Sequence, residues 1–126
     1  MRKTIIATDG APRPGAQFSQ AVKCAGLVFV SGTFPADPIT GRIVGDTIQE
    51  QTAQALRNIS VILEEAGSSL AKAVSATVII THETDFPGLN EEWAKWFPVD
   101  PPARQGAKMP INVPGMRISI AMIAEA

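Results

Sequence analysis

The stretch that decides the fold runs from Asp46 to Gly67 and reads DTIQEQTAQALRNISVILEEAG. Its apolar residues recur every three or four positions, the spacing of one face of an α-helix. Asp46, followed three residues later by Gln49, has the form of an N-terminal capping box, and Gly67 can end the helix. We therefore predict a helix over residues 48–66. Its polar residues are expected to form a solvated face: Gln51, Gln54, Arg57, Glu64 and Glu65.

Short β-prone runs lie on both sides of this helix. The predicted strands are residues 3–7, 18–23, 27–32, 71–81, 104–109 and 116–124, and a second helix is predicted over residues 86–97. The run 27–32 is apolar throughout, as expected of a strand buried on both faces. The run 116–124 alternates, with Ile118, Ile120 and Met122 on one face and Ser119 and Ala121 on the other.

This order of elements predicts an α+β fold, a two-layer domain spanning residues 1–126. It would have a mixed sheet of five or six strands with both helices on one face. The other face of the sheet would be bare, and burial against further copies of the chain is the simplest way to cover it. The sequence therefore predicts an oligomer.

Composition excludes several classes of function. The chain has 126 residues, 18% of them charged, and a net charge of −1 without a basic run, so nucleic acid is a poor partner. A single cysteine, Cys24, excludes an internal disulfide and favours a reducing, cytoplasmic location. No apolar run approaches the length of a membrane span. Cys24 and the lone His82 make no plausible metal site.

Two segments have the chemistry of anion binding. The first is residues 101–106, PPARQG, where two prolines stiffen the approach to Arg104 and Gly106 permits a close backbone approach. A guanidinium matches a carboxylate two-pronged, although a solvated arginine at a strand end is the alternative. The second is Ser31-Gly32, where a backbone amide at the end of a strand can bind an anion, or can simply begin a turn.

Together these stretches resemble the Rid family of reactive-intermediate (imine/enamine) deaminases over essentially the whole chain. The matching stretches are residues 18–21, 27–32, 52–67, 85–90 and 102–104. The resemblance implies a chorismate-mutase-like fold and a homotrimer whose sheets form a central barrel. It also implies small carboxylate-bearing substrates in clefts between subunits. The implied reaction is cofactor-free hydrolysis of 2-enamino or 2-imino acids to 2-oxo acids and ammonia.

The resemblance also assigns roles to individual residues. Arg104 matches the arginine that holds the substrate carboxylate, and Gly32, with Ser31 beside it, matches the strand end whose amide assists. Asn90 matches an asparagine near the site. Phe18 stands where many members have tyrosine, so a hydroxyl is missing from the cleft.

The last strand departs from the family pattern. Deaminating members read approximately Ile-Glu-Ile-Glu-Ala-Ile-Ala, whereas residues 118–124 read ISIAMIA, which puts Ser119 in place of the water-positioning carboxylate. Serine can hold a water, but at neutral pH it cannot accept a proton as a carboxylate does. Loss of a general acid or base typically costs about 10²- to 10⁴-fold in rate.

Three hypotheses follow from this departure. The chain is an imine/enamine deaminase in which Arg104 and a water held by Ser119 suffice through positioning. Alternatively, it is a diverged enzyme that acts on another carboxylated substrate. In the third, it is a non-catalytic binder of small carboxylates or of a partner protein. Ribonuclease activity ranks last, because the sequence has no paired histidines and no basic groove.

Overall fold

The computed structural model describes residues 2–126, which form one sheet with two helices. The strands are β1 (Thr4–Ile6), β2 (Ala21–Cys24), β3 (Leu27–Thr33), β4 (Ala73–Ile80), β5 (Ala103–Lys108) and β6 (Ile118–Glu125). The helices are α1 (Ile48–Glu65) and α2 (Phe86–Trp96), and single 3₁₀ turns at Leu70–Lys72 and Glu83–Asp85 precede β4 and α2.

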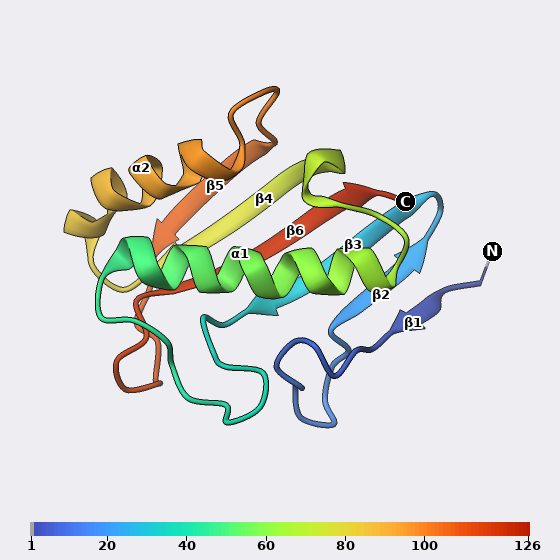
Figure 1. Cartoon of the computed structure of the whole chain (residues 1–126), viewed down its shortest axis with the longest axis horizontal. Helices are drawn as coiled ribbons and strands as arrows, with labels where there is room; N and C mark the ends of the chain where they lie inside the picture. The colour runs from blue at the N-terminus through green and yellow to red at the C-terminus, as the bar shows by residue number, and fades with distance from the viewer. Residues whose placement is uncertain (1) are drawn as a thin grey trace.

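The six strands lie in the order β1-β2-β3-β6-β4-β5. All neighbouring pairs are antiparallel except β4 and β5, which are parallel and connected through α2. Both helices cover the same face of the sheet (Figure 1). The predicted α+β class, the mixed sheet and the one-sided placement of the helices are therefore confirmed.

Helix α1 begins at Ile48, as predicted, but its N-cap residue is Thr47 rather than Asp46. Thr47 is the N-cap, its Oγ1 accepts a hydrogen bond from the Glu50 amide at 3.1 Å, and the Glu50 carboxylate accepts one from the Thr47 amide. The prediction of a box between Asp46 and Gln49 was wrong, because Thr47, directly before the first helical residue Ile48, is the N-cap, and the third helical residue is therefore Glu50. Gly67 follows the helix at a φ of +82°, as expected of a C′ glycine.

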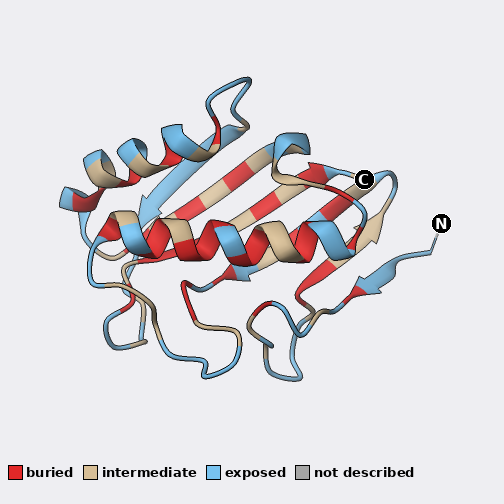
Figure 2. Cartoon of the chain, in the orientation of Figure 1, coloured by how far each residue is buried: buried red, intermediate tan, exposed pale blue. Residues whose placement is uncertain are grey.

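The core lies between α1, α2 and the covered face of the sheet. Figure 2 shows buried segments recurring along α1, with intermediate and exposed segments between them, and further buried segments on the strands behind the helix. Leu56 and Ile59 of α1 pack in the same cluster as Val78 of β4 and Ile120 of β6, all of them fully buried. Trp93 of α2 is also buried in this cluster.

The polar side of α1 differs from the prediction. Gln51 and Gln54 were expected in solvent but are buried. The loops before α1 and before β6 contact Gln51, whereas Gln54 is hydrogen-bonded to Asn58 and Arg57 of the same helix. Gln51 Nε2 donates to the backbone oxygens of Gly45 and Gly115, while its Oε1 accepts from the Arg117 amide at 2.7 Å. These bonds satisfy backbone groups that the covering loops bury.

The face of the sheet opposite the helices is uncovered in the single chain. The prediction that residues 27–32 are buried on both faces was therefore wrong for one chain, since Phe29 keeps 40% of its surface exposed. A shallow hollow of about 150 Å³ lies on this face, bordered by Phe29, Thr77, Ala121 and Ile123. The alternation predicted for β6 is confirmed, with Ile118 and Ile120 turned to the core.

Candidate functional site

Arg104 lies on β5 at the edge of the sheet, and α2 holds its side chain on the covered face. Its Nη2 donates a hydrogen bond to Asn90 Oδ1 at 2.6 Å, and its guanidinium carbon lies 5.1 Å from the centroid of the Trp93 ring. Asn90 and Trp93 are three residues apart on α2 and therefore share a face. The arginine is thus held in one direction by a hydrogen bond and by a cation–π contact.

Gly106 explains how α2 comes close enough to make these contacts. A Cβ atom at Gly106 would lie 2.8 Å from Val78 Cγ2 and 3.2 Å from the Phe86 ring, and both distances are too short for ordinary packing. The first turn of α2 therefore packs directly over the backbone of β5. The predicted close approach at this glycine is confirmed, and its partner is Phe86.

The charge of Arg104 is not neutralised within the chain. Among residues 2–126, no carboxylate oxygen lies within 4.0 Å of its nitrogens. Partial burial lowers the pKa of the Arg104 guanidinium, but an arginine remains protonated at neutral pH. Asn90 occupies one terminal nitrogen, so donors remain for an incoming anion. A guanidinium that is oriented but unpaired is suited to binding a carboxylate.

Gly32 and Ser119 lie together on neighbouring strands. The register between β3 and β6 shifts between Val30 and Thr33, so Gly32 sits in an irregular stretch of β3. A Cβ atom at Gly32 would lie 3.1 Å from Ser119 Oγ, which places the serine against the glycine backbone. Ser119 is 9% exposed and lies on the uncovered side of β6.

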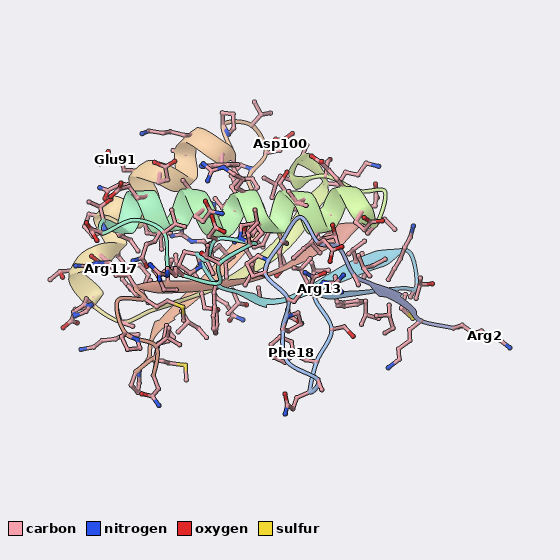
Figure 3. All side chains as sticks on the ribbon, turned by 60° about the horizontal axis from the view of Figure 1, so that its bottom comes forward. Arg2, Arg13, Phe18, Glu91, Asp100 and Arg117 are labelled. Carbon is pink, nitrogen blue, oxygen red and sulfur yellow. The ribbon has the colours of Figure 1, made fainter. Side chains whose placement is uncertain are left out.

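Ser31 and Phe18 flank this pair from the β1–β2 side. Ser31 Oγ donates to the Ser19 backbone oxygen at 2.6 Å, and its amide donates to the Gln20 backbone oxygen at 3.0 Å, so it fastens β3 to the residues before β2. Phe18 was predicted to begin a strand over residues 18–23, but it lies in the loop that connects β1 with β2, and the strand begins at Ala21 (Figure 3). Its side chain is largely in solvent, with 53% of the residue surface exposed. Phe18, Ser31 and Gly32 line one cavity of about 300 Å³.

Within one chain the predicted site residues form two separate groups. The first group is Arg104 with Asn90, and the second is Gly32, Ser31, Phe18 and Ser119. Arg104 pairs with Ala76 of β4, while Ser119 pairs with Ile79. Two strand spacings and three residues along the strand separate them by roughly 14 Å. They also lie on opposite faces of the sheet, so one chain cannot present both to one small molecule.

Sequence reasoning missed one member of the first group. Trp93 was not among the predicted site residues, yet one face of its ring supports Arg104 while the rest is buried. The i, i+3 spacing from Asn90 was the available signal, because it places the two side chains side by side on α2. The spacing of residues along the sequence did not predict that β5 pairs in parallel with β4, the pairing that places β5 beneath this face of α2.

Two further features of the described residues concern metal ligands and membrane spans. Among residues 2–126, no three side chains of the types His, Cys, Asp and Glu come close enough together to hold a metal ion. Neither α1 nor α2 combines the length and the apolar character needed to cross a membrane.

The sequence and the fold are both similar to those of known proteins. Residues 8–126 match the family model described as endoribonuclease L-PSP. The chain is similar to the chloroplastic Reactive Intermediate Deaminase A of Arabidopsis thaliana, with 36% identity over 98% of this chain and 66% of the relative. Its fold matches the crystal structure of YyfA from Yersinia pestis, a protein of the Rid family. That match has a TM-score of 0.93 and 32% identity, covering 99% of this chain and 100% of the other. A further match is the crystal structure of Escherichia coli TdcF with bound serine, with a TM-score of 0.90, 31% identity and 98% of each chain covered.

Proposed function

The chain belongs to the Rid family, and from this premise we propose that it hydrolyses 2-imino and 2-enamino acids. An enamine first becomes the imine tautomer, R–C(=NH)–COO⁻. Water then adds to the imine carbon, the carbon–nitrogen bond breaks, and the products are R–CO–COO⁻ and ammonia. The relative named Reactive Intermediate Deaminase A and the serine bound to TdcF support this class of ligand, since serine has the same α-carboxylate.

The observation that supports the proposal most is the state of Arg104. Its guanidinium is fixed by Asn90 and Trp93 and has no carboxylate partner among residues 2–126. A substrate carboxylate supplies the missing anion and binds two-pronged, which fixes the imine carbon at a set distance from the arginine. Such positioning can lower the barrier of a reaction that is already easy in water.

The proposed site is completed between subunits. Because Arg104 and Gly32 lie in separate groups in one chain, we propose that a homotrimer brings Arg104 of one subunit to Gly32 of the next. The uncovered face of the sheet, with Phe29 and Ile123 on it, would pack into the centre of this trimer. All six residues of β5 are exposed in the single chain, so this edge is free for such a contact.

Ser119 holds the attacking water in this proposal. Its Oγ lies beside Gly32, whose amide is a further donor for the substrate carboxylate. A serine can accept a hydrogen bond from water and orient it, but it cannot remove the proton, so the proton must leave to solvent or to the departing amine. The proposed rate is therefore set by positioning and falls below that of a carboxylate-assisted reaction.

The same serine favours a second candidate function. With Ser119 in place of a carboxylate, the site retains the means to bind a carboxylate and loses the means to activate water. A binder of small carboxylates, or an enzyme for another carboxylated substrate, has the same Arg104 geometry. The family model's ribonuclease description has less support in this chain, since the net charge is −1 and the single His82 is exposed and bonded to Thr81.

A coupled assay separates these functions. A serine dehydratase generates 2-aminoacrylate, and release of pyruvate is followed with the wild type and with R104A, S119E and R42A. Arg42 is exposed and makes no side-chain hydrogen bond among the described residues, so R42A is the matched control. We expect acceleration by the wild type and R42A, and a loss of at least about 100-fold in R104A.

The remaining outcomes have equally definite meanings. An inert wild type together with an active S119E variant would assign the chain to carboxylate binding or to another substrate. Sedimentation of the wild type at micromolar concentration tests the assembly, and a protein that sediments only as a monomer would refute the site between subunits.

A further inference from the structure

The cavity beside Gly32 has a chemistry that the proposed reaction leaves unused. It lies between the β1–β2 loop, the end of β3 and the last turn of α1, which contributes Ile62. Its walls are apolar: Pro12, Pro14, Phe18, Phe34 and Ile62. Arg13 and Phe18 both come from this loop, which projects from the sheet in Figure 3.

The polar side chains that line the cavity already have hydrogen-bond partners within the chain. Gln20 Nε2 donates to the backbone oxygens of Thr8 and Pro12, and its Oε1 accepts from the Thr8 amide at 2.7 Å. Ser31 Oγ donates to Ser19, and the Arg13 guanidinium is bonded to Asp9 at 2.6 Å. A polar ligand group that entered the cavity would lose its bonds to water and gain few in return, whereas an apolar group is stabilised by leaving water.

The size of the cavity indicates the size of that apolar group. Its volume is about 300 Å³. A cavity of about 150 Å³ is enough to hold a benzene molecule. A benzyl or isobutyl group therefore fits with room to spare, and a methyl group leaves most of the space empty.

Gly32 connects this cavity to the proposed reaction site. It lines the cavity on one side, and on the other side its backbone lies against Ser119. A substrate whose carboxylate is held by Arg104 and the Gly32 amide can therefore direct its side chain into the cavity. Resting on the proposed function, we propose that the cavity is the side-chain subsite and that the preferred substrates are 2-imino acids with a bulky apolar side chain.

Gly15 allows the cavity to be filled without disturbing the backbone. It lines the cavity and is not among the glycines with a positive φ. A Cβ atom there would meet only Gln17 Oε1, at 2.8 Å, which is the end of a flexible, exposed side chain. G15L therefore adds a bulky apolar side chain at a residue that lines the cavity, with no backbone atom in its way. A16L adds the same side chain one residue further on, at an exposed position outside the cavity, and is the matched control.

The test compares two imines generated by an amino-acid oxidase, one from phenylalanine and one from alanine. We expect the wild type to prefer the benzyl imine over the methyl imine by at least about tenfold in kcat/KM. G15L should bring this ratio close to one, and A16L should leave it unchanged. F34A, which removes an exposed wall of the cavity, should also lower the ratio and serves if G15L does not fold. An unchanged ratio in folded G15L would overturn the proposal.

A binding measurement separates failure of this inference from failure of the proposed function. If the wild type accelerates hydrolysis of neither imine, calorimetry with phenylpyruvate and pyruvate replaces the kinetic ratio. Binding of phenylpyruvate at least about tenfold more tightly than pyruvate, with the difference lost in G15L, supports the subsite in a non-catalytic binder. Equal affinities, or no binding of either compound, contradict it.

Discussion

Arg104 is the second residue of β5 and Arg117 directly precedes β6, but the two arginines differ in whether a carboxylate is bound to them. Arg117 Nη1 bonds both carboxylate oxygens of Asp85, at 3.0 and 3.2 Å, and its Nε donates to the backbone oxygen of Asp46. Arg104 has an amide oxygen and an aromatic ring as neighbours and no carboxylate partner in the described chain. Arg117 is a structural cation because it is paired with a carboxylate, whereas Arg104, which has no such partner among the described residues, is available to a ligand.

The region around Arg117 is a junction of loops and helix ends. It joins the start of β6, the N-terminus of α1 and the residue before α2, and Gln51 accepts the Arg117 amide at the same point. Figure 3 shows Arg117 well away from the loop that bears Phe18. Because Arg117 is bonded there to Gln51, Asp46 and Asp85, we expect substitutions in this region to change stability and those around Arg104 to change ligand binding.

The largest effect is expected from R104K. Lysine keeps the positive charge but loses the planar fork and the stacking on Trp93, so two-pronged binding of a carboxylate is lost. We expect kcat/KM for the imine to fall by about 100-fold while the melting temperature stays within a degree or two, since Arg104 is exposed. A variant with unchanged kcat/KM would show that a point charge is sufficient.

R117M should produce the opposite result. It leaves the Asp85 carboxylate, with a side chain 11% exposed, without its cation. Breaking a fully buried pair costs about 3–5 kcal/mol, and since Arg117 is 37% exposed we expect a loss of about 2 kcal/mol in the free energy of unfolding. Urea denaturation measures it, and the double variant with D85N should recover part of the loss. Activity per folded molecule should remain.

N90A tests whether the hydrogen bond from Arg104 to Asn90 orients the arginine for ligand binding. Removing the Oδ1 acceptor frees the guanidinium to adopt other directions, although the charge and Trp93 remain. We expect KM to rise by about tenfold, the cost of one lost charge-assisted hydrogen bond that orients the arginine, with a smaller change in kcat. Equal losses in both constants would instead place Asn90 in contact with the reacting atoms.

The smallest effect is expected from T47A, next to Asp46 in the Arg117 region. Loss of the N-cap hydroxyl should lower the free energy of unfolding by about 1 kcal/mol. The hydrogen bond from the Thr47 hydroxyl, with the amides of Thr47 and Asp46, lowers the pKa of Glu50. Because the pKa of Glu50 is lower in the folded chain than in the unfolded chain, its ionised form stabilises the folded chain at pH values above the unfolded pKa. This stabilisation disappears as the pH falls through the folded pKa. The difference between T47A and the wild type should therefore shrink below about pH 4, which denaturation at several pH values would detect.

Predictions from the sequence succeeded where a local pattern carries the information. The 3.6-residue period of α1 and the alternation of β6 depend only on neighbours in the chain, and both are confirmed. The prediction that Gln51 and Gln54 lie in solvent was wrong. The burial of Gln51 depends on a loop that returns from a distant part of the sequence, where Gly115 accepts its hydrogen bond. The capping box was displaced by one residue because Asp46 and Thr47 are both good N-cap residues, and only the first helical φ and ψ decide between them.

The candidate site shows the same division. The sequence alone shows that Arg104 follows a rigid Pro-Pro segment. It also shows that Ser119 stands where the family pattern has a carboxylate. Only the tertiary structure decided that Asn90 and Trp93 hold Arg104, that Gly32 lies against Ser119, and that the two groups are apart in one chain. The physical reason is the strand order: β6, the last strand, inserts between β3 and β4, and no local pattern records which strands become neighbours.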